Sequence, residues 1–243
     1  MNEAVEYKAK TRLYLDQSLA LDSRAQPSAD QAHYLAHVLR LRPGAPVLVF
    51  NGRDGEWAAE YQADGLSVLR QTRAQISLAP LALVFAPLKK DQTDFVIQKA
   101  TELGATSIHP VFTTHSNTLR FNQERATAHA IEAAEQSHRL CVPKIHPAQN
   151  LAQALTTWSQ TQKLFWADEM GGGENLAVAL TAAPKTGCGF LIGPEGGFSA
   201  QERQELSANP NIKAIHLGPR ILRAETAANA CLSIYQALAG DWR

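Results

Sequence analysis

Three features that mark other classes of protein are missing from this sequence of 243 residues: an excess of one charge, a long hydrophobic run and a framework of cysteines. Lysine plus arginine and aspartate plus glutamate number 23 each, so the net positive charge typical of nucleic-acid binders is absent. This balance argues only weakly against a nucleic-acid partner, because binding depends on where the positive charge is placed and a neutral total can conceal a basic face.

No apolar stretch approaches the roughly 18 residues that a membrane-spanning helix needs. The first dozen residues are polar and do not resemble the apolar core of a signal peptide. With 45% hydrophobic residues, the chain has enough apolar side chains for a sizeable core. We therefore expect a soluble globular protein of the cytoplasm, without a membrane partner.

The cysteines and histidines predict no metal site. Cys141, Cys188 and Cys231 are odd in number and far apart, which fits neither a disulfide framework nor a Cys-x-x-Cys metal site. Buried free thiols are the expected outcome. His33 and His37 have a spacing that permits a metal, but no third ligand is evident, so a solvated pair is expected instead.

Several familiar catalytic and nucleotide-binding motifs are absent as well. The glycine-rich turn at 193–199, Gly-Pro-Glu-Gly-Gly-Phe-Ser, lacks both the G-x-G-x-x-G spacing of dinucleotide sites and the Gly-Lys-Ser/Thr of a P-loop. The chain also shows no nucleophile elbow and no persuasive Ser/His/Asp arrangement.

The first 74 residues have the pattern of a small, mostly β domain with one helix. Ser28 and Gln31 have the spacing of a capping box and open a helix that is expected to bury Ala32, Leu35, Val38 and Leu39. A hairpin is predicted around the Asn- and Gly-rich residues 51–55. Strands are expected at 13–15, 47–50, 57–61, 66–69 and 74–78.

From residue 75 to residue 243, apolar strands alternate with helices, which predicts an α/β domain with a mainly parallel sheet. Strands are expected at 81–86, 108–112, 163–167, 189–192 and 212–217. Helices are expected from Asp91 or Thr93 to 104, and at 122–140, 150–158, 176–182 and 199–208. A last helix presents an apolar face at Ala227, Ala230, Cys231, Ile234 and Leu238.

Two strand-to-helix turns, at 193–199 and 217–227, are the candidate ligand sites, because α/β proteins bind ligands at such turns. Two of them in one chain predict one pocket with two walls. The first turn is either a plain connector or a binding turn, in which Pro194 adds stiffness and Glu195 an acceptor.

The second turn places Arg220 and Arg223 at the start of a helix, where a cation opposes the helix dipole. Either Arg223 forms a salt bridge with Glu225 or a neighbour, or an arginine here faces an anion such as a phosphate backbone. The polar residues 132–139, among them Arg139, are accounted for by a solvated helix face with internal ion pairs.

Taken together, these residues resemble the bacterial 16S ribosomal RNA uridine-N3 methyltransferases, the RsmE family of the knotted SPOUT superfamily. The resemblance covers nearly the full length, and the two turns are its most specific part. It is carried by Arg12, residues 33–35 and 38–40, Lys89, Lys90, residues 98–104 and 132–139, and both turns. The family often has Glu-Arg-Ser where this chain has Thr114-His115-Ser116.

The resemblance implies a PUA-like β-barrel domain at 1–74 that helps to bind RNA, and a SPOUT methyltransferase domain at 75–243 with a C-terminal trefoil knot. It also implies a homodimer in which the partner chain completes each site. S-adenosylmethionine would lie bent among three loops, whose implied cofactor-binding residues are Asp168, Glu169, Ile192, Gly193, Pro194, Glu195, Gly196, Gly197, Leu217, Gly218, Arg220, Ile221 and Leu222.

The implied reaction is methyl transfer to N3 of a uridine in the decoding region of 16S rRNA, within the 30S subunit. A cation could favour the uridine anion, with Arg223 or Arg139 as candidates, and Glu225 or Glu195 could accept the proton. Candidate phosphate contacts are Arg12, Arg40, Arg42, Lys89, Lys90 and Arg120. A ribose 2′-O-methyltransferase and a non-catalytic RNA-binding protein remain as alternatives.

Overall fold

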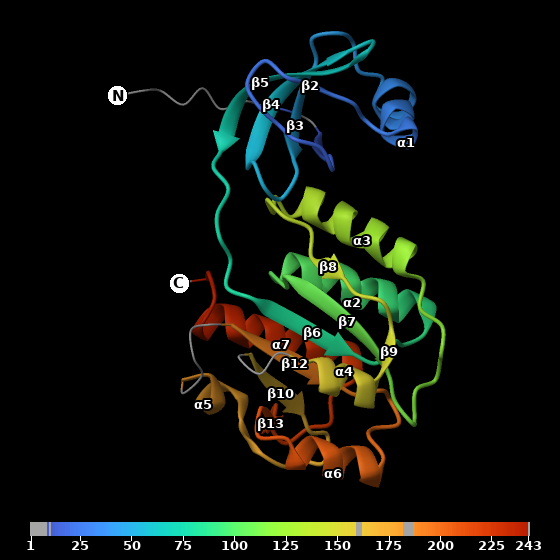
Figure 1. Cartoon of the computed structure of the whole chain (residues 1–243), viewed down its shortest axis with the longest axis vertical. Coiled ribbons are helices and arrows are strands. Elements are labelled where there is room, and N and C mark those ends of the chain that lie inside the picture. Colours follow the sequence, from blue (N-terminus) through green and yellow to red (C-terminus); the bar gives the residue numbers. More distant parts are fainter. Residues whose placement is uncertain (1–8, 10, 159–161, 182–186, 243) are drawn as a thin grey trace. The chain divides into compact units, whose positions relative to one another are not determined.

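The structure is a computed structural model that describes residues 9, 11–158, 162–181 and 187–242 (Figure 1). The chain divides into two compact units. The first contains Met1–Ser77 together with Ala134–Val142, and the second contains Leu78–Ala133 together with Pro143–Arg243. A domain boundary between residues 74 and 75 would place the segment Ala134–Val142 in the second domain. In the structure this segment belongs to the first unit.

The first unit is built on a five-stranded sheet with the order β1-β3-β4-β5-β2. β1 pairs with β3 in parallel and the other neighbours are antiparallel. The predicted hairpin is confirmed as β3–β4. The strands are β1 (Arg12–Tyr14), β2 (Arg24–Ala25), β3 (Pro46–Phe50), β4 (Glu56–Gln62) and β5 (Gly65–Arg73).

The strand predicted at 74–78 is wrong. Residues 74–80 have no regular structure, and β5 instead extends to Arg73. Arg73 pairs with Glu56, the first residue of β4, so the partner strand ends there and a longer β5 would have unpaired backbone groups.

The predicted capping box is confirmed: Ser28 and Gln31 bond each other's backbone at the start of α1 (Ala29–His33). The helix continues as the π-helical turn η1 (Tyr34–Val38), in which the Leu39 amide donates to the Tyr34 carbonyl. The wider turn shifts the phase of the side chains. As a result Leu35 is buried and Leu39 partly so, whereas Ala32 and Val38, predicted to be buried, are exposed.

Arg12 belongs to the core of the first unit. Its side chain is 7% exposed, lies over the Phe50 ring and pairs with Glu56 at 2.7 Å between Nε and Oε2. The guanidinium also donates to the carbonyl oxygens of Ala134 and Arg139. The protein's own acceptors thus occupy this guanidinium, which gives Arg12 a structural role, and its predicted contact with phosphate stays a prediction.

The second unit contains a parallel sheet with the order β11-β13-β10-β12-β6-β7-β8, and β9 pairs with β7 beyond this path. Every residue of β6 and β12 is buried, as predicted for strands covered on both faces. The strands are β6 (Leu81–Phe85), β7 (Ser107–Phe112), β8 (Lys144–Ile145), β9 (Gln149–Asn150), β10 (Lys163–Ala167), β11 (Glu174–Asn175), β12 (Cys188–Ile192) and β13 (Ile212–His216).

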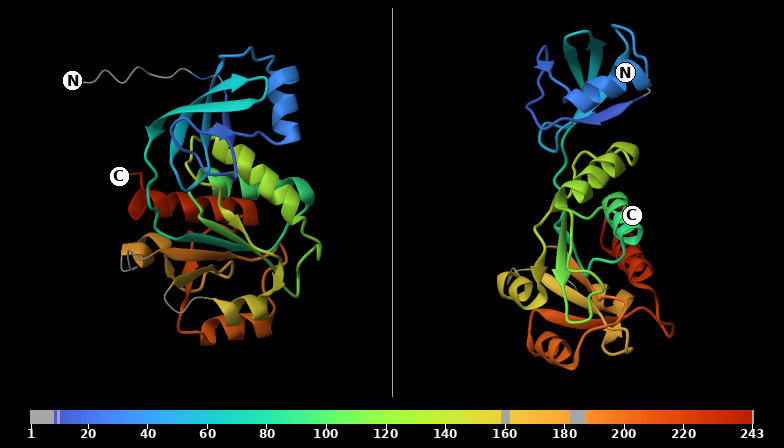
Figure 2. Two further views of the ribbon diagram at one scale, coloured as in Figure 1. Left: turned by 45° about the horizontal axis from the view of Figure 1, so that its top comes forward. Right: turned by 90° about the vertical axis from the view of Figure 1, so that its right-hand side faces the viewer.

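Helices cover both faces of this sheet: α2 and α7 pack together on one face, and α4 and α6 lie on the other (Figures 1 and 2). The predicted caps at Asn150 and Ser199 are confirmed. The N-cap of α2, the first helix of this unit, is however Lys89 rather than Asp91 or Thr93. The helices are α2 (Lys90–Glu102), α3 (Gln123–Gln136), α4 (Leu151–Thr157), α5 (Leu176–Thr181), α6 (Ala200–Ala208) and α7 (Ala224–Leu238).

The ends and faces of the helices and the burial of the thiols agree with the predictions in part. Ala182, the predicted end of α5, lies outside the described residues. In α7 the predicted face is only partly right: Ala227 and Cys231 are buried, but Ala230 and Ile234 are half-buried and Leu238 is 44% exposed. The buried face also includes Ala228, Leu232 and Tyr235, because α7 packs on both β12 and α2. Cys188 and Cys231 are buried free thiols as predicted, whereas Cys141 is half-buried.

Within the part of the chain that the structure describes, no helix is long and apolar enough to cross a membrane. The same residues contain no group of three potential ligands placed to hold a metal ion. The strand order does not by itself define a knot, so the C-terminal trefoil knot stays a prediction.

Two stacked histidines lie in β7 and directly after β8. The rings of His109 and His146 are 3.9 Å apart and nearly parallel, and His109 contacts the Ser107 hydroxyl at 2.9 Å. Burial, and then the charges of His146 and Lys144, lower the pKa of His109 to about 4. Burial also lowers the pKa of His146, with Lys144 adding to the effect.

We expect the free energy of unfolding to fall as the pH is lowered from 6.5 to about 4, because the unfolded chain protonates His109 near 6.5 while the folded protein keeps it neutral. The contribution of neutral His109 to the free energy of unfolding is fully present above pH 6.5. Between the two pKa values, one such group changes this free energy by about 1.4 kcal/mol per pH unit. Denaturant unfolding measured across the window should give a shallower slope for His109→Gln. The exposed His33→Gln is the control and should match the wild type; equal slopes for all three proteins would contradict the prediction.

Candidate functional site

Three loops at the carboxyl ends of neighbouring strands form one pocket in the second unit. They follow β10, β12 and β13, which are parallel and adjacent in the sheet. The cavity between them is about 630 Å³, a volume typical of small-molecule sites. The predicted pair of walls is thus present, and the loop after β10 adds a third.

The structure brings together twelve of the thirteen residues predicted to bind a cofactor; the exception is Gly196, which does not line the cavity. Sequence reasoning did not include Ala227, which lines the cavity from one turn inside α7. The lining consists of residues 167–171, Ile192, Gly193, Pro194, Glu195, Gly197, residues 215–224 and Ala227.

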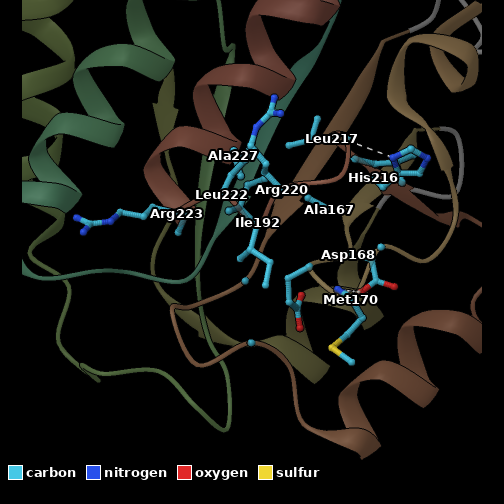
Figure 3. Close-up of a pocket in the computed structure, with 18 of the residues that line it drawn as sticks. Ala167, Asp168, Met170, Ile192, His216, Leu217, Arg220, Leu222, Arg223 and Ala227 are labelled. Atoms are coloured by element: carbon cyan, nitrogen blue, oxygen red, sulfur yellow. Dashed lines mark hydrogen bonds between the residues drawn. The ribbon is translucent and has the colours of Figure 1, made fainter.

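The cavity has apolar walls and a rim that combines exposed apolar and charged side chains. Ile192, Leu217 and Leu222 contribute to the walls, and Met170 and Ile221, at 76% and 83% exposure, lie at the edge. Large apolar side chains this exposed are characteristic of binding surfaces. In Figure 3 the Arg223 guanidinium extends away from the side of the pocket that holds Asp168 and Met170.

Arg203 of α6 ties the β10 loop in place. The Asp168 carboxylate is 8% exposed, accepts from the Met170 amide and pairs with the Arg203 guanidinium at 2.8 Å between Nη1 and Oδ1. The same guanidinium reaches Glu169 at 3.3 Å and lies over the Trp166 ring. One arginine therefore orients both carboxylates at this end of the pocket.

The turn after β12 requires glycine at two positions for different reasons. A Cβ at Gly193 would lie 2.7 Å from the Phe198 ring, whose edge packs on the core residue Trp166. Gly197 has a φ of +68°, and a Cβ there would lie 2.6 Å from Glu169 Oε1. Its amide donates to the Pro194 carbonyl and closes the turn. The turn is thus fitted closely to the core and to the neighbouring loop.

A second cavity of about 820 Å³ is lined by Lys89, Lys90, Asp91, Gln92, Glu195 and Arg223. Glu195 and Arg223 line both cavities, so the two spaces meet at this pair. Lys89 and Arg223 are the N-caps of α2 and α7, and neither side chain bonds the helix backbone. The second cavity therefore combines cationic side chains with two helix N-termini, a combination that attracts anions.

The remaining candidates are distributed over both units. Arg139 lies in the first unit, where its carbonyl accepts from Arg12. Glu225 has one buried carboxylate oxygen without a hydrogen-bond partner in the described part of the chain, and neither cavity's described lining includes it. The predicted phosphate contacts Arg40, Arg42, Lys89, Lys90 and Arg120 are all exposed.

Comparison with known families gives the class of protein. Residues 75–236 match the RNA methyltransferase domain family, and residues 27–68 match the RNA methyltransferase PUA domain family. The second unit with its three-loop pocket is accordingly an RNA methyltransferase domain.

Individual relatives narrow the class to one family. The chain is 34% identical to the ribosomal RNA small subunit methyltransferase E of Rickettsia conorii over 89% of this chain and 91% of the relative. For the Bacillus subtilis protein of the same name the identity is 30%, covering 85% and 87%. The Neisseria gonorrhoeae enzyme, solved bound to S-adenosyl methionine, superposes with a TM-score of 0.84 at 28% identity, covering 96% and 99%. This protein belongs to the ribosomal RNA small subunit methyltransferase E family.

The close contact at Gly193 gives a test of the turn. We expect Gly193→Ala to lower the free energy of unfolding by about 1–3 kcal/mol, because the new methyl group would overlap the Phe198 ring. Phe198→Leu removes the ring edge, so the double variant should be less destabilised than the sum of the single variants by about 1 kcal/mol. Denaturant unfolding of all four proteins measures this coupling, and strictly additive losses would contradict the assigned contact.

Proposed function

We propose that this protein transfers the methyl group of S-adenosylmethionine to N3 of a uridine in the decoding region of small-subunit ribosomal RNA. Family membership and the S-adenosyl methionine bound to the Neisseria gonorrhoeae relative support the cofactor and the RNA class. The observation that carries the mechanism is that Glu195 and Arg223 line both the three-loop pocket and the adjoining basic cavity.

The residues of the three-loop pocket fit S-adenosylmethionine. Ile192, Leu217 and Leu222 would provide apolar contacts for the adenine ring, and the backbone of Gly193 would offer hydrogen bonds to its polar edge. The Asp168 and Glu169 carboxylates complement the positive charge and hydroxyl groups of the cofactor. When bound, the cofactor supplies an electrophilic methyl group on a sulfonium, so the work of the protein is positioning and charge.

Residues of the chain itself must remove the proton on N3, because uridine is protonated there at neutral pH. We assign the Arg223 guanidinium to stabilise the uridine anion and the Glu195 carboxylate to accept the proton. Both side chains lie where the two cavities meet. Arg139 and Glu225, the other candidates, are absent from the described linings of both cavities.

Phosphate contacts follow from exposed cations around the second cavity and on the first unit. Lys89 and Lys90, which line that cavity, would hold the RNA backbone beside the target uridine. Arg120, exposed elsewhere on the second unit, would add a further contact, and Arg40 and Arg42 would make the contacts of the PUA-like unit. A homodimer acting on the assembled 30S subunit in the cytoplasm completes the proposal.

Methyl transfer to 16S RNA tests the function. Unmodified RNA and 30S subunits from a strain lacking this gene are incubated with the protein and labelled S-adenosylmethionine, and mass mapping locates the methyl group. The proposal expects one N3-methyluridine. A ribose 2′-O-methyl group would show a different RNA methyltransferase, and no transfer together with no cofactor binding in calorimetry would show a non-catalytic RNA-binding protein. Sedimentation of the active protein tests the dimer.

Replacement of Arg223 separates catalysis from cofactor binding. We expect Arg223→Ala to lower kcat by about 100-fold, because it removes a charge aimed at the developing anion. The dissociation constant for S-adenosylmethionine should stay within about threefold of the wild type. Arg24→Ala, which removes an exposed ion pair with Asp64 in the first unit, is the control. A collapse of cofactor affinity in Arg223→Ala would mean that the assignment is wrong.

The role of Lys90 is tested by salt. If its ammonium contacts phosphate, Lys90→Gln should weaken RNA binding and reduce the slope of log K against log salt by about 0.7–0.9. The control is Lys99→Gln on the same helix. Lys99 pairs with Glu102, so its replacement should leave the slope unchanged. Binding titrations at several salt concentrations give both slopes, and an unchanged slope for Lys90→Gln removes it from the RNA contacts.

A further inference from the structure

The loop at residues 113–117, which follows β7, contacts the turn after β12. His115 Nδ1 lies 3.1 Å from the Gly196 carbonyl oxygen and 3.2 Å from that of Gly197. Asn117 Nδ2 donates to Glu195 Oε2 at 2.8 Å. Two side chains of one loop thus hold three consecutive residues of the other, although about 80 residues separate the two loops in the sequence.

These contacts fix the chemical form of His115. Carbonyl oxygens only accept hydrogen bonds, so Nδ1 must carry the proton and donate to both of them. The approach is also close: a Cβ added at Gly196 would lie 3.0 Å from His115 Cβ. This explains why Gly196 belongs to the turn without lining the cavity.

Asn117 governs a side chain that would otherwise be free to rotate. Glu195 is exposed, and among the described residues Asn117 is the one whose side chain is bonded to its carboxylate. Lys89, Lys90, Asp91 and Arg223 line the cavity that Glu195 faces. Lys89, Lys90 and Arg223 are alternative partners for this carboxylate on the same cavity wall, and the amide of Asn117 selects one orientation.

The loop is itself anchored. The Ser116 hydroxyl bonds the Thr113 amide at 2.9 Å, and the Thr114 amide donates to Glu202 Oε1 at 2.8 Å. Glu202 is 8% exposed, and its other oxygen accepts from the Ser199 amide in the capping box of α6. One buried carboxylate therefore connects the loop to the helix that follows the turn, so the loop can hold the turn rather than move with it.

We propose that the 113–117 loop is a positioning element of the methyl-transfer site, in which Asn117 orients the Glu195 carboxylate and His115 fixes the backbone of Gly196 and Gly197. The inference rests on the proposed function through the proton-accepting role given to Glu195. It gives the segment Thr114-His115-Ser116 a role in holding the turn after β12.

The two residues should give different kinetic signatures. Asn117→Ala is expected to lower kcat about tenfold while the dissociation constant for S-adenosylmethionine stays within twofold, and Asn117→Asp, which cannot donate when ionised, should lower kcat at least as much. His115→Ala should weaken cofactor binding about fivefold, because Gly197 lines the cofactor pocket. His115→Asn should restore the affinity, since its amide nitrogen can donate from nearly the same place.

Calorimetry with S-adenosylmethionine, single-turnover methylation of 16S RNA and thermal melting are measured on each full-length variant. Leu119→Ala is the control in the same stretch of chain, where Leu119 is 71% exposed, and it should behave as the wild type. Unchanged kcat in both Asn117 variants together with unchanged cofactor affinity in His115→Ala would overturn the inference. If the wild type transfers no methyl group, it is the proposed function that fails, and the affinities of the His115 variants still test the contact with the turn.

Discussion

The parallel register of β10, β12 and β13 is the constraint on which the site depends. Adjacent parallel strands end at the same edge of a sheet, so the three loops that follow them must meet. The register is held by strands buried on both faces, since a slip of one residue in β12 would exchange the packing of both layers. Core packing therefore sets the positions of the three loops. Within each loop only local contacts, such as that of Gly193 with the Phe198 ring, remain to be satisfied.

The neutral total charge conceals cations in different environments. Lys89, Lys90 and Arg223 line the second cavity together with Asp91 and Glu195, whereas Arg203 is paired with the carboxylates of Asp168 and Glu169. Arg12 shows that a basic residue in an RNA-binding family can be structural, because the desolvation of its guanidinium is offset by Glu56 and two carbonyl oxygens. A count of basic residues does not distinguish structural arginines from cations free to bind RNA, whereas their burial and their hydrogen-bond partners do.

Local signals in the sequence predicted local structure well. The N-caps at Ser28 and Ser199, the hairpin at residues 51–55 and the two turns that line one pocket are all short-range features, and all are present. The π-helical turn η1, the end of β5 and the return of Ala134–Val142 to the first unit depend on tertiary partners distant in the chain, and the sequence alone does not reveal them. The same holds for Gly196, whose partner His115 lies 81 residues away.

The departures from local rules coincide with the site. N-cap positions favour Ser, Thr, Asp and Asn, and α1, α4 and α6 follow this preference with a bonded side chain. At α2 and α7 the N-caps are Lys89 and Arg223, which leave backbone donors unbonded and place cations at the positive ends of two helix dipoles. Each placement costs a few tenths of a kcal/mol or more in the free protein. An anionic ligand in the cavity between them would bond the free donors and offset both charges, so the instability that the fold tolerates here is removed by the RNA phosphate that the cavity is proposed to bind.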